Sequence, residues 1–318
     1  MELWADYRVQ KLHAPFTRAR YGDLYSGCFL SRFMDTSDNI KLKEYRALRN
    51  NIDLYIMHDS YLANQLKKEN FIGVDSLVLS DLRNKKGVYF KLRKDKENIL
   101  IIECSERTAE WRLGDSALAF TKFYTTNRLQ EVKKVKEPKD KLIKYFFNPF
   151  IEQNLEFNLF DYEVFKPVKE LKAGLNFYWF NKLPKDVAVS SDKEYLLLPE
   201  TVNPWKQESS FRGISDNELD KIAVQMKQIK KHYRKLGFKK IFFAVVPNPA
   251  SIIDQKRMRY NYKIGRIIGR YGTPDDFIDV FKIFEHARKR IYRRDDSHWN
   301  RNGIQLWINE VNKKISSL

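Results

Sequence analysis

The 318-residue chain has few of the residues on which metal sites and disulfide scaffolds depend. It contains two cysteines, Cys28 and Cys104, and five histidines, and no spacing among them matches a known metal-ligand pattern. Two unclustered thiols do not make a disulfide framework, and Cys104 lies in an apolar run typical of a core strand. We therefore expect neither a metal site nor a cofactor.

Long apolar segments are also missing. No run of about 18 apolar residues occurs, so no transmembrane helix is expected. The first residues lack the charged-then-apolar pattern of a signal peptide. Either the protein is cytoplasmic, or a leader or anchor is missing from this sequence.

Positive charge is the strongest feature of the composition. The formal net charge is +18, and hydrophobic residues make up 43% of the chain, which is enough for a packed core. A basic surface favours nucleic acid, anionic lipid or acidic polysaccharide. Solvated helix faces explain basic clusters equally well, so charge alone selects no partner. The clusters lie at 133–136, 230–235 and 288–294.

Short apolar runs predict the strands of a parallel sheet. They lie at 52–57, 98–103 and 240–246, and unbroken apolar strands are typical of a sheet covered on both faces. An amphipathic helix at 215–236, capped by Ser215 or Asp216, precedes the third run. This succession of helix and strand predicts an α/β fold.

The middle of the chain differs in composition from the rest. Aromatic residues and prolines are frequent between 115 and 212, so we interpret this region as an insertion or cap between the two parts of the α/β domain, 1–114 and 213–318. Within the insertion, 177–180 and 195–198 predict short strands. A helix is expected near 41–48.

A loop near the C-terminus places two carboxylates beside a histidine, ahead of an amphipathic helix. These residues are Asp295, Asp296 and His298. A carboxylate close to an imidazole can hold its tautomer and stabilise its protonated form. His298 is therefore the best candidate for a general base, with either aspartate as its partner.

Four serines compete to be the nucleophile that such a base needs. Ser60 follows the first strand and precedes a predicted helix at 62–68, whereas Ser76 has no helix after it. Ser105 follows the second strand and competes on position, and Ser116 follows a segment that is not a buried strand. Open α/β sheets keep their active sites at the carboxyl ends of strands, and helix N-terminal N–H groups can receive an oxyanion. We favour Ser60, although a helix N-cap is an equally common role for a serine at this place.

Together these stretches resemble the SGNH, or GDSL-type, hydrolase superfamily, and within it the alginate O-acetyltransferase-like branch, whose histidine loop reads Asp-x-His-Trp. The resemblance covers 50–110 and 240–312, including a strand that ends in Glu-Arg at 101–107 and one that ends in a proline-polar turn at 243–249. The sequence departs from the superfamily in two ways: His58 stands where glycine is usual, and the Gly-x-Asn-Asp block is absent. The serine precedes the histidine loop, as in ordinary SGNH enzymes but unlike in much of the branch.

The resemblance implies a three-layer, flavodoxin-like parallel sheet with a large insertion. It also implies a catalytic triad of Ser60, His298 and Asp296, with Asp295 as the alternative because the superfamily spaces these two residue types three apart. Glu106 and Arg107 would close the cleft or form a structural ion pair. The full set of candidate oxyanion or cleft residues is Tyr61, Asn64, Ser105, Glu106, Arg107, His58 and Trp299.

The activity implied is the transfer of an acyl group, chiefly acetyl, to or from carbohydrate hydroxyls. The excess of positive charge suits an acidic polysaccharide, and a membrane-bound partner could supply the acyl group. The cell envelope is then the expected location. The alternative is a catalytically inactive scaffold of the same fold that binds an anionic polysaccharide or another polyanion. A nucleic-acid partner would rest on charge alone and is not expected.

Overall fold

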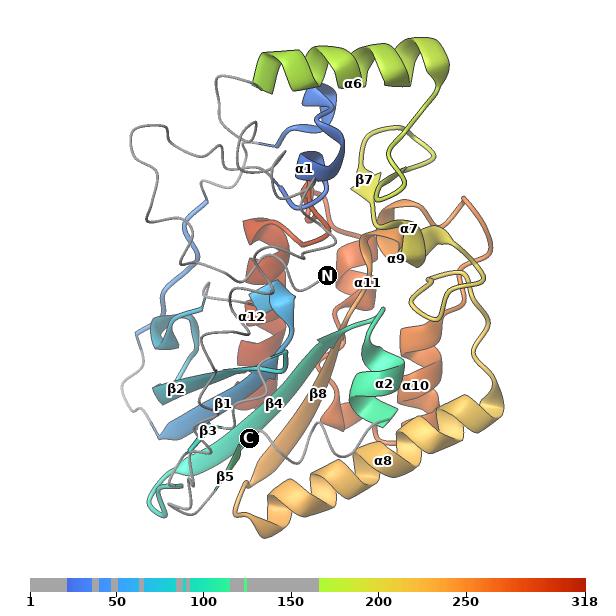
Figure 1. Ribbon diagram of the computed structural model, residues 1–318. Coiled ribbons are helices and arrows are strands. Elements are labelled where there is room, and N and C mark those ends of the chain that lie inside the picture. The colour runs from blue at the N-terminus through green and yellow to red at the C-terminus, as the bar shows by residue number, and fades with distance from the viewer. Residues whose placement is uncertain are drawn as a thin grey trace, which may run out of the picture.

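Four parallel strands form the central sheet of the computed structural model, in the order β2-β1-β4-β8 (Figure 1). The structure describes residues 22–35, 40–46, 51–62, 66–83, 88–89, 92–114, 123–124 and 166–318. The strands of the sheet are β1 (Ile52–His58), β2 (Val74–Asp81), β4 (Glu97–Ser105) and β8 (Lys240–Val246). All three pairings are parallel, so the predicted parallel sheet is confirmed.

Helices cover both faces of this sheet. One face carries α2 (Ala109–Gly114), α8 (Asp216–Lys235) and α10 (Lys263–Tyr271), and the other carries α12 (Arg301–Ser316) (Figure 1). Alternate residues of one strand enter the two cores: Ile241 and Phe243 lie in the first, and Phe242 in the second. Burial on both faces explains why the strands read as unbroken apolar runs.

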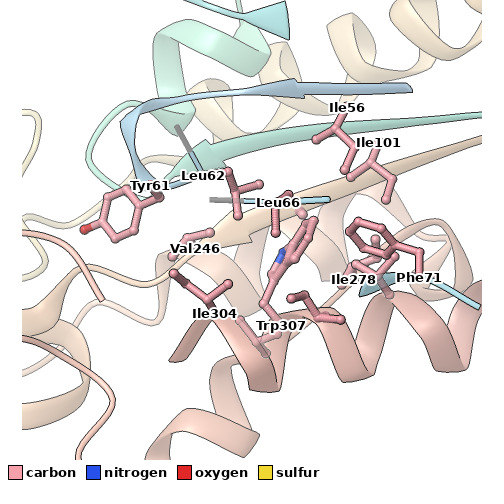
Figure 2. Close-up of a cluster of buried hydrophobic side chains, with 14 of the residues drawn as sticks. Ile56, Tyr61, Leu62, Leu66, Phe71, Ile101, Val246, Ile278, Ile304 and Trp307 are labelled. Carbon is pink, nitrogen blue, oxygen red and sulfur yellow. The ribbon is translucent and has the colours of Figure 1, made fainter. Parts of the chain in front are cut away.

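The second core joins the serine end of β1 to the last helix. Figure 2 shows Ile56, Ile101 and Val246 on the sheet facing Ile304 and Trp307 on α12, with other apolar side chains packed between them. Ile56, Ile101, Ile304 and Trp307 have no exposed surface. Burying each of these side chains contributes on the order of 1.5–3 kcal/mol relative to leaving it in water.

The order of the strands creates a topological switch point beside β1, where the connections leave the sheet in opposite directions. The chain passes from β1 to β2 on one side and later to β4 on the other, so β1 is hydrogen-bonded to both. In open α/β sheets, the crevice at the carboxyl ends of the strands is left uncovered at such a point. Ser60 follows β1 at this position, and Arg107 follows β4.

The two long helices begin at residues whose side chains cap them. Ser215 accepts from the backbone N–H of Glu218, whose carboxylate in turn accepts from the backbone N–H of Ser215, a capping box. Of the two predicted caps for α8, the structure therefore has Ser215. The cap of α12 is Asn300, whose side-chain oxygen accepts from two backbone N–H groups of the first turn.

A third, smaller apolar cluster, the α1 cluster, lies beyond the carboxyl ends of the strands (Figure 1). It unites α1 (Tyr25–Cys28) and α6 (Lys166–Phe180) with β6 (Ala188–Val189) and β7 (Leu196–Leu197), which pair antiparallel. The remaining described elements are short: β3 (Val88–Tyr89), β5 (Phe123–Tyr124), α7 (Pro199–Val202), α9 (Pro249–Ile253), α11 (Phe281–Glu285), and the 3-10 helices η2 (Ser31–Phe33), η3 (Ser60–Leu62), η4 (Lys68–Asn70) and η6 (Pro274–Asp276).

Three local predictions are wrong. The predicted strand at 177–180 is the last turn of α6, because Phe177 packs as a helical residue on the α1 cluster. The predicted helix at 41–48 is absent over 41–46, where the N–H of Tyr45 donates to Glu69 and that of Lys43 to Gln305 instead of to a helical neighbour. Of the predicted helix at 62–68, residues 63–65 lie outside the described part of the chain, Leu62 ends the 3-10 turn η3, and Lys67 is extended ahead of η4.

Among the described residues, none of the helices has the length and apolar character needed to cross a bilayer.

Candidate active site

Ser60 and His298 meet at the carboxyl end of β1. The Nε2 atom of His298 lies 2.8 Å from Ser60 Oγ, within the reach that a nucleophile and its base require. Ser60 is held in the serine turn, residues 58–62, and His298 in the histidine loop, residues 295–300. The two residues stand 238 positions apart in the chain.

Asp296, rather than Asp295, completes this chain of hydrogen bonds. Its Oδ1 lies 2.5 Å from His298 Nδ1 and also accepts the backbone N–H of His298. Asp295 is fully buried, accepts from Arg293 Nε at 3.0 Å and receives the backbone N–H of Asp35. The carboxylate two residues before the histidine therefore faces the ring, and its neighbour anchors the loop.

The charge of His298 sets the ionisation of Asp296. Burial raises the pKa of Asp296, but the hydrogen bond and positive charge of His298 outweigh burial, so this pKa lies well below its ordinary value. Asp296 is therefore ionised over the working pH range and favours the protonated imidazole that a proton transfer creates.

A third carboxylate, Asp23, lies against the same ring. Its Oδ2 is 3.7 Å from His298 Nδ1, and its Oδ1 accepts the backbone N–H of Ser297 at 2.7 Å. The pKa of Asp23 is raised to about 6, by burial first and then by the negative charge of Asp296. Asp23 thus changes charge near neutral pH within reach of the imidazole.

Tyr61 and Trp299 clamp the serine turn to the histidine loop. The Tyr61 hydroxyl donates to the Ser297 carbonyl, and the Trp299 indole N–H donates to the Tyr61 carbonyl, both at 2.8 Å. Their rings meet edge to face at 5.4 Å, a favourable aromatic geometry. Both side chains are buried, so they position the site instead of lining its surface.

A buried carboxyl group on β4 holds the backbone of the serine turn. Glu103 of β4 accepts the backbone N–H of Asp59 at 2.8 Å, and the Asp59 carboxylate accepts the N–H of Ser60 at 3.0 Å. Thr108 donates to the other Asp59 oxygen, and Arg112 lies 3.8 Å from the carboxylate. Burial, and then the charge of Asp59, raises the pKa of Glu103 well above its usual range.

Ser105 and Glu106 are both fully buried. Ser105 Oγ lies 2.9 Å from Thr108 Oγ1. Glu106 accepts from the Asn248 backbone N–H at 3.0 Å and the Tyr260 hydroxyl at 2.9 Å, and it is also bonded to the Ser251 hydroxyl. These contacts tie β4 to the turn after β8 and leave neither side chain facing an incoming substrate.

Arg107 is the remaining candidate at the end of β4. Its backbone N–H donates to Asn248 Oδ1 at 3.2 Å, while its half-buried guanidinium makes no hydrogen bond or ion pair within the described part of the chain. The positive charge of this guanidinium acts on the Tyr61 hydroxyl. His58 is buried with Nδ1 2.7 Å from the Asp59 carbonyl, and Asn64 lies outside the described residues.

Asp23 joins Asp296 and His298 in a group of three, and no sequence spacing reveals the part of Asp23. One potential metal-ligand atom from each lies within 4.8 Å of the others. However, His298 Nδ1 is already bonded to Asp296 and Nε2 faces Ser60. A metal on this ring would replace one of those two hydrogen bonds, so the geometry fits a hydrogen-bonded triad better.

Sequence reasoning missed Asp23, Glu103 and Thr108. Asp23 lies 273 positions from Asp296, in an N-terminal segment without clear periodicity, and no local motif marks it. Glu103 sits inside an apolar strand, and an acidic residue in such a run is a signal for a buried polar contact. That signal was present in the sequence.

Searches among known protein families, curated proteins and solved structures found no match to this chain. The site therefore has to be interpreted from its own geometry.

Proposed function

We propose that the protein is a serine-dependent acyltransferase or esterase that acts on acyl groups, chiefly acetyl, carried by carbohydrate hydroxyls. The single observation that carries this proposal is the continuous chain from Ser60 Oγ through His298 to Asp296, with both contacts at hydrogen-bond distance. The position of Ser60 at the switch point of a parallel sheet supports it as well. We assign the fold to the SGNH type on the same residues.

In the first half-reaction, His298 Nε2 takes the proton of Ser60 Oγ as that oxygen attacks the acyl carbonyl carbon. The tetrahedral intermediate collapses when His298 returns the proton to the departing oxygen, which leaves the acyl group on Ser60. In the second half-reaction, His298 removes a proton from a sugar hydroxyl or from water, and this oxygen takes the acyl group. Asp296 holds Nδ1–H throughout.

The oxyanion needs donors that are not already engaged. The Ser60 N–H donates to Asp59, and Asn248 uses its side chain on Arg107 and Ser210. The Arg107 guanidinium is the charged donor left at the end of the neighbouring strand, and we assign it to the oxyanion or to an acidic group of the substrate.

A fluorophosphonate probe tests this proposal, because it labels only an activated serine. The wild-type chain should be labelled at Ser60, and Ser60→Ala should abolish the label. Ser317→Ala is the matched control, since its hydroxyl donates to the Lys314 carbonyl at the end of α12. Absence of labelling at any probe concentration, or labelling that survives Ser60→Ala, contradicts the proposal. With labelling established, incubation with an acetyl donor and an oligosaccharide distinguishes transfer from hydrolysis.

A second candidate function, binding of a polyanion, is favoured by one surface feature. A cavity of about 510 Å³ near the end of α8 is lined by five basic side chains together with a tyrosine and a threonine: Lys227, Lys230, Lys231, Arg234, Lys235, Tyr271 and Thr273. Of the five, Lys230 pairs with Asp276. Weaker retention of Lys231→Gln/Arg234→Gln than of wild type on an acidic polysaccharide column supports this candidate. Lys313→Gln, an exposed change on another helix, is the control. Equal retention of wild type, the double variant and Lys313→Gln contradicts polyanion binding at this cavity.

A further inference from the structure

Helix α6 carries apolar side chains on two opposite faces. The inner face packs on the α1 cluster through Ala173 and Phe177, and the Phe177 ring meets Phe33 edge to face at 6.4 Å. Besides Phe180 at the end of the helix, five large apolar side chains of α6 are exposed to solvent, and they lie on the outer face. They are Val168, Leu171, Leu175, Tyr178 and Trp179.

The outer residues form one continuous stripe. Positions 168, 171, 175 and 178 follow the three- and four-residue spacing that places helical side chains on a single face, and Ala173 and Phe177 fall on the side facing the body. Leu171 is 66% exposed and Trp179 is 78% exposed. A contiguous apolar surface of this kind is typical of an interaction site.

Contacts on the inner side fix the direction in which the stripe points. The Tyr25 hydroxyl is bonded to Glu170, and Lys169 Nζ lies 4.3 Å from the centre of the Phe29 ring. Rotation of α6 about its axis would break these contacts together with the Phe177 packing. The stripe is therefore held outward.

Positive charge borders the stripe and selects the partner. Lys172, Lys182 and Lys185 are exposed on α6 and just beyond it, whereas Glu170 is turned inward to Tyr25. A helix with Leu and Trp on one side and lysines along its edge matches an interfacial membrane helix. We propose that the outer face of α6 docks the protein on an anionic phospholipid surface.

A second copy of this chain fits the same face less well. Symmetric pairing through the stripe places the border lysines of both copies at one interface, and this accumulation of positive charge opposes association. An anionic bilayer instead neutralises these lysines and accepts the apolar stripe. The net charge of +18 acts in the same direction.

Docking would bring the bilayer to the end of the molecule that holds the triad. The backbone N–H groups of Leu24 and Tyr25 donate to the Asp295 carbonyl at 3.1 and 2.9 Å, so α1 contacts both α6 and the histidine loop. Figure 1 shows α6 beyond the carboxyl ends of the strands. The docking proposal does not depend on the chemistry of Ser60.

Vesicle sedimentation with the full chain tests docking. We expect binding to vesicles that contain phosphatidylglycerol, little binding to pure phosphatidylcholine, and loss at high salt. Leu171→Gln/Trp179→Gln should weaken binding about tenfold or more, because membrane affinity scales with buried apolar area. Trp205→Gln removes another exposed tryptophan, 89% exposed and outside α6, and should bind like wild type.

Alkylation of Leu171→Cys by a maleimide gives an independent readout, since Cys28 and Cys104 are buried. The new thiol should react quickly in buffer and slowly with anionic vesicles. Slow reaction in buffer alone means that the chain itself covers the stripe, and this overturns the proposal. So does equal vesicle binding by the double variant, no binding by wild type, or a dimer in ultracentrifugation that the double variant abolishes.

Discussion

The indole N–H of Trp299 donates to the backbone carbonyl of Tyr61 at 2.8 Å, across 238 positions of sequence. The Tyr61 hydroxyl in turn donates to the backbone carbonyl of Ser297. The distance between Ser60 and His298 therefore depends on two hydrogen bonds that neither residue makes. Residues with no part in the chemistry hold the two halves of the site together.

Trp299→Phe should separate this positioning role from simple packing. The substitution keeps an aromatic ring but leaves the buried Tyr61 carbonyl without its donor, which costs about 1–3 kcal/mol of the free energy of unfolding. We also expect a several-fold fall in kcat/KM for p-nitrophenyl acetate. Trp307→Phe is the control, because the buried Trp307 indole N–H has no partner in the described structure. Equal loss of activity in both variants contradicts the positioning role.

Asp296→Asn should act mainly on catalysis, whereas Asp295→Asn should act mainly on stability. The first removes the carboxylate that holds His298 Nδ1, so kcat should fall by roughly 10²–10⁴-fold in protein that remains folded. The second weakens the buried contact with Arg293, so it should lower stability by about 1–3 kcal/mol. Steady-state kinetics and denaturation measure the two effects. A larger activity loss for Asp295→Asn would reverse the assignment.

Asp23→Asn should move the acid limb of the pH–activity profile to lower pH. The pKa of Asp23 is raised to about 6, so above this pH its negative charge lies close to His298 and favours the protonated imidazole, which cannot act as a base. Asn removes that charge, and Asp296, which lies 3.9 Å from Arg293, remains bonded to the ring. The profile of kcat/KM between about pH 5 and pH 8 measures the shift. An unchanged limb with lower activity indicates a structural role alone.

Glu103→Gln should flatten the decline of stability with rising pH. Burial raises the pKa of Glu103 well above its usual range, so the folded state retains the proton. Its contribution to stability is complete at low pH and is lost as the pH rises through the raised pKa. Gln does not titrate and can still accept the Asp59 N–H, so its free energy of unfolding should not show this decline.

Urea denaturation from about pH 4 upwards measures that difference, because the unfolded chain loses this proton at the ordinary pKa of glutamate. Glu103→Ala is the informative companion, because it removes the acceptor of the Asp59 N–H and should cost about 1–3 kcal/mol at every pH. A Gln variant that declines in parallel with wild type shows that another group controls the decline.

Apolar pattern and helix signals were sufficient to predict the scaffold. The runs at 52–57 and 240–246 correspond to β1 and β8, because strands buried on both faces carry no polar alternation. Ser215 caps α8 by local chemistry that needs no other part of the chain. The segment at 177–180 was predicted wrongly, since its helical form depends on packing against α1.

The sequence by itself determined the parallel sheet and nominated Ser60 and His298, because a strand end and a carboxylate–histidine loop are local patterns. Tertiary structure decided that Asp296 faces the imidazole and Asp295 does not. It also brought in Asp23, Glu103 and the clamp of Tyr61 and Trp299, from segments far apart in the chain. The physical reason is that hydrogen-bond direction and burial follow from how strands and loops pack, and spacing along one segment carries no information about a partner on another.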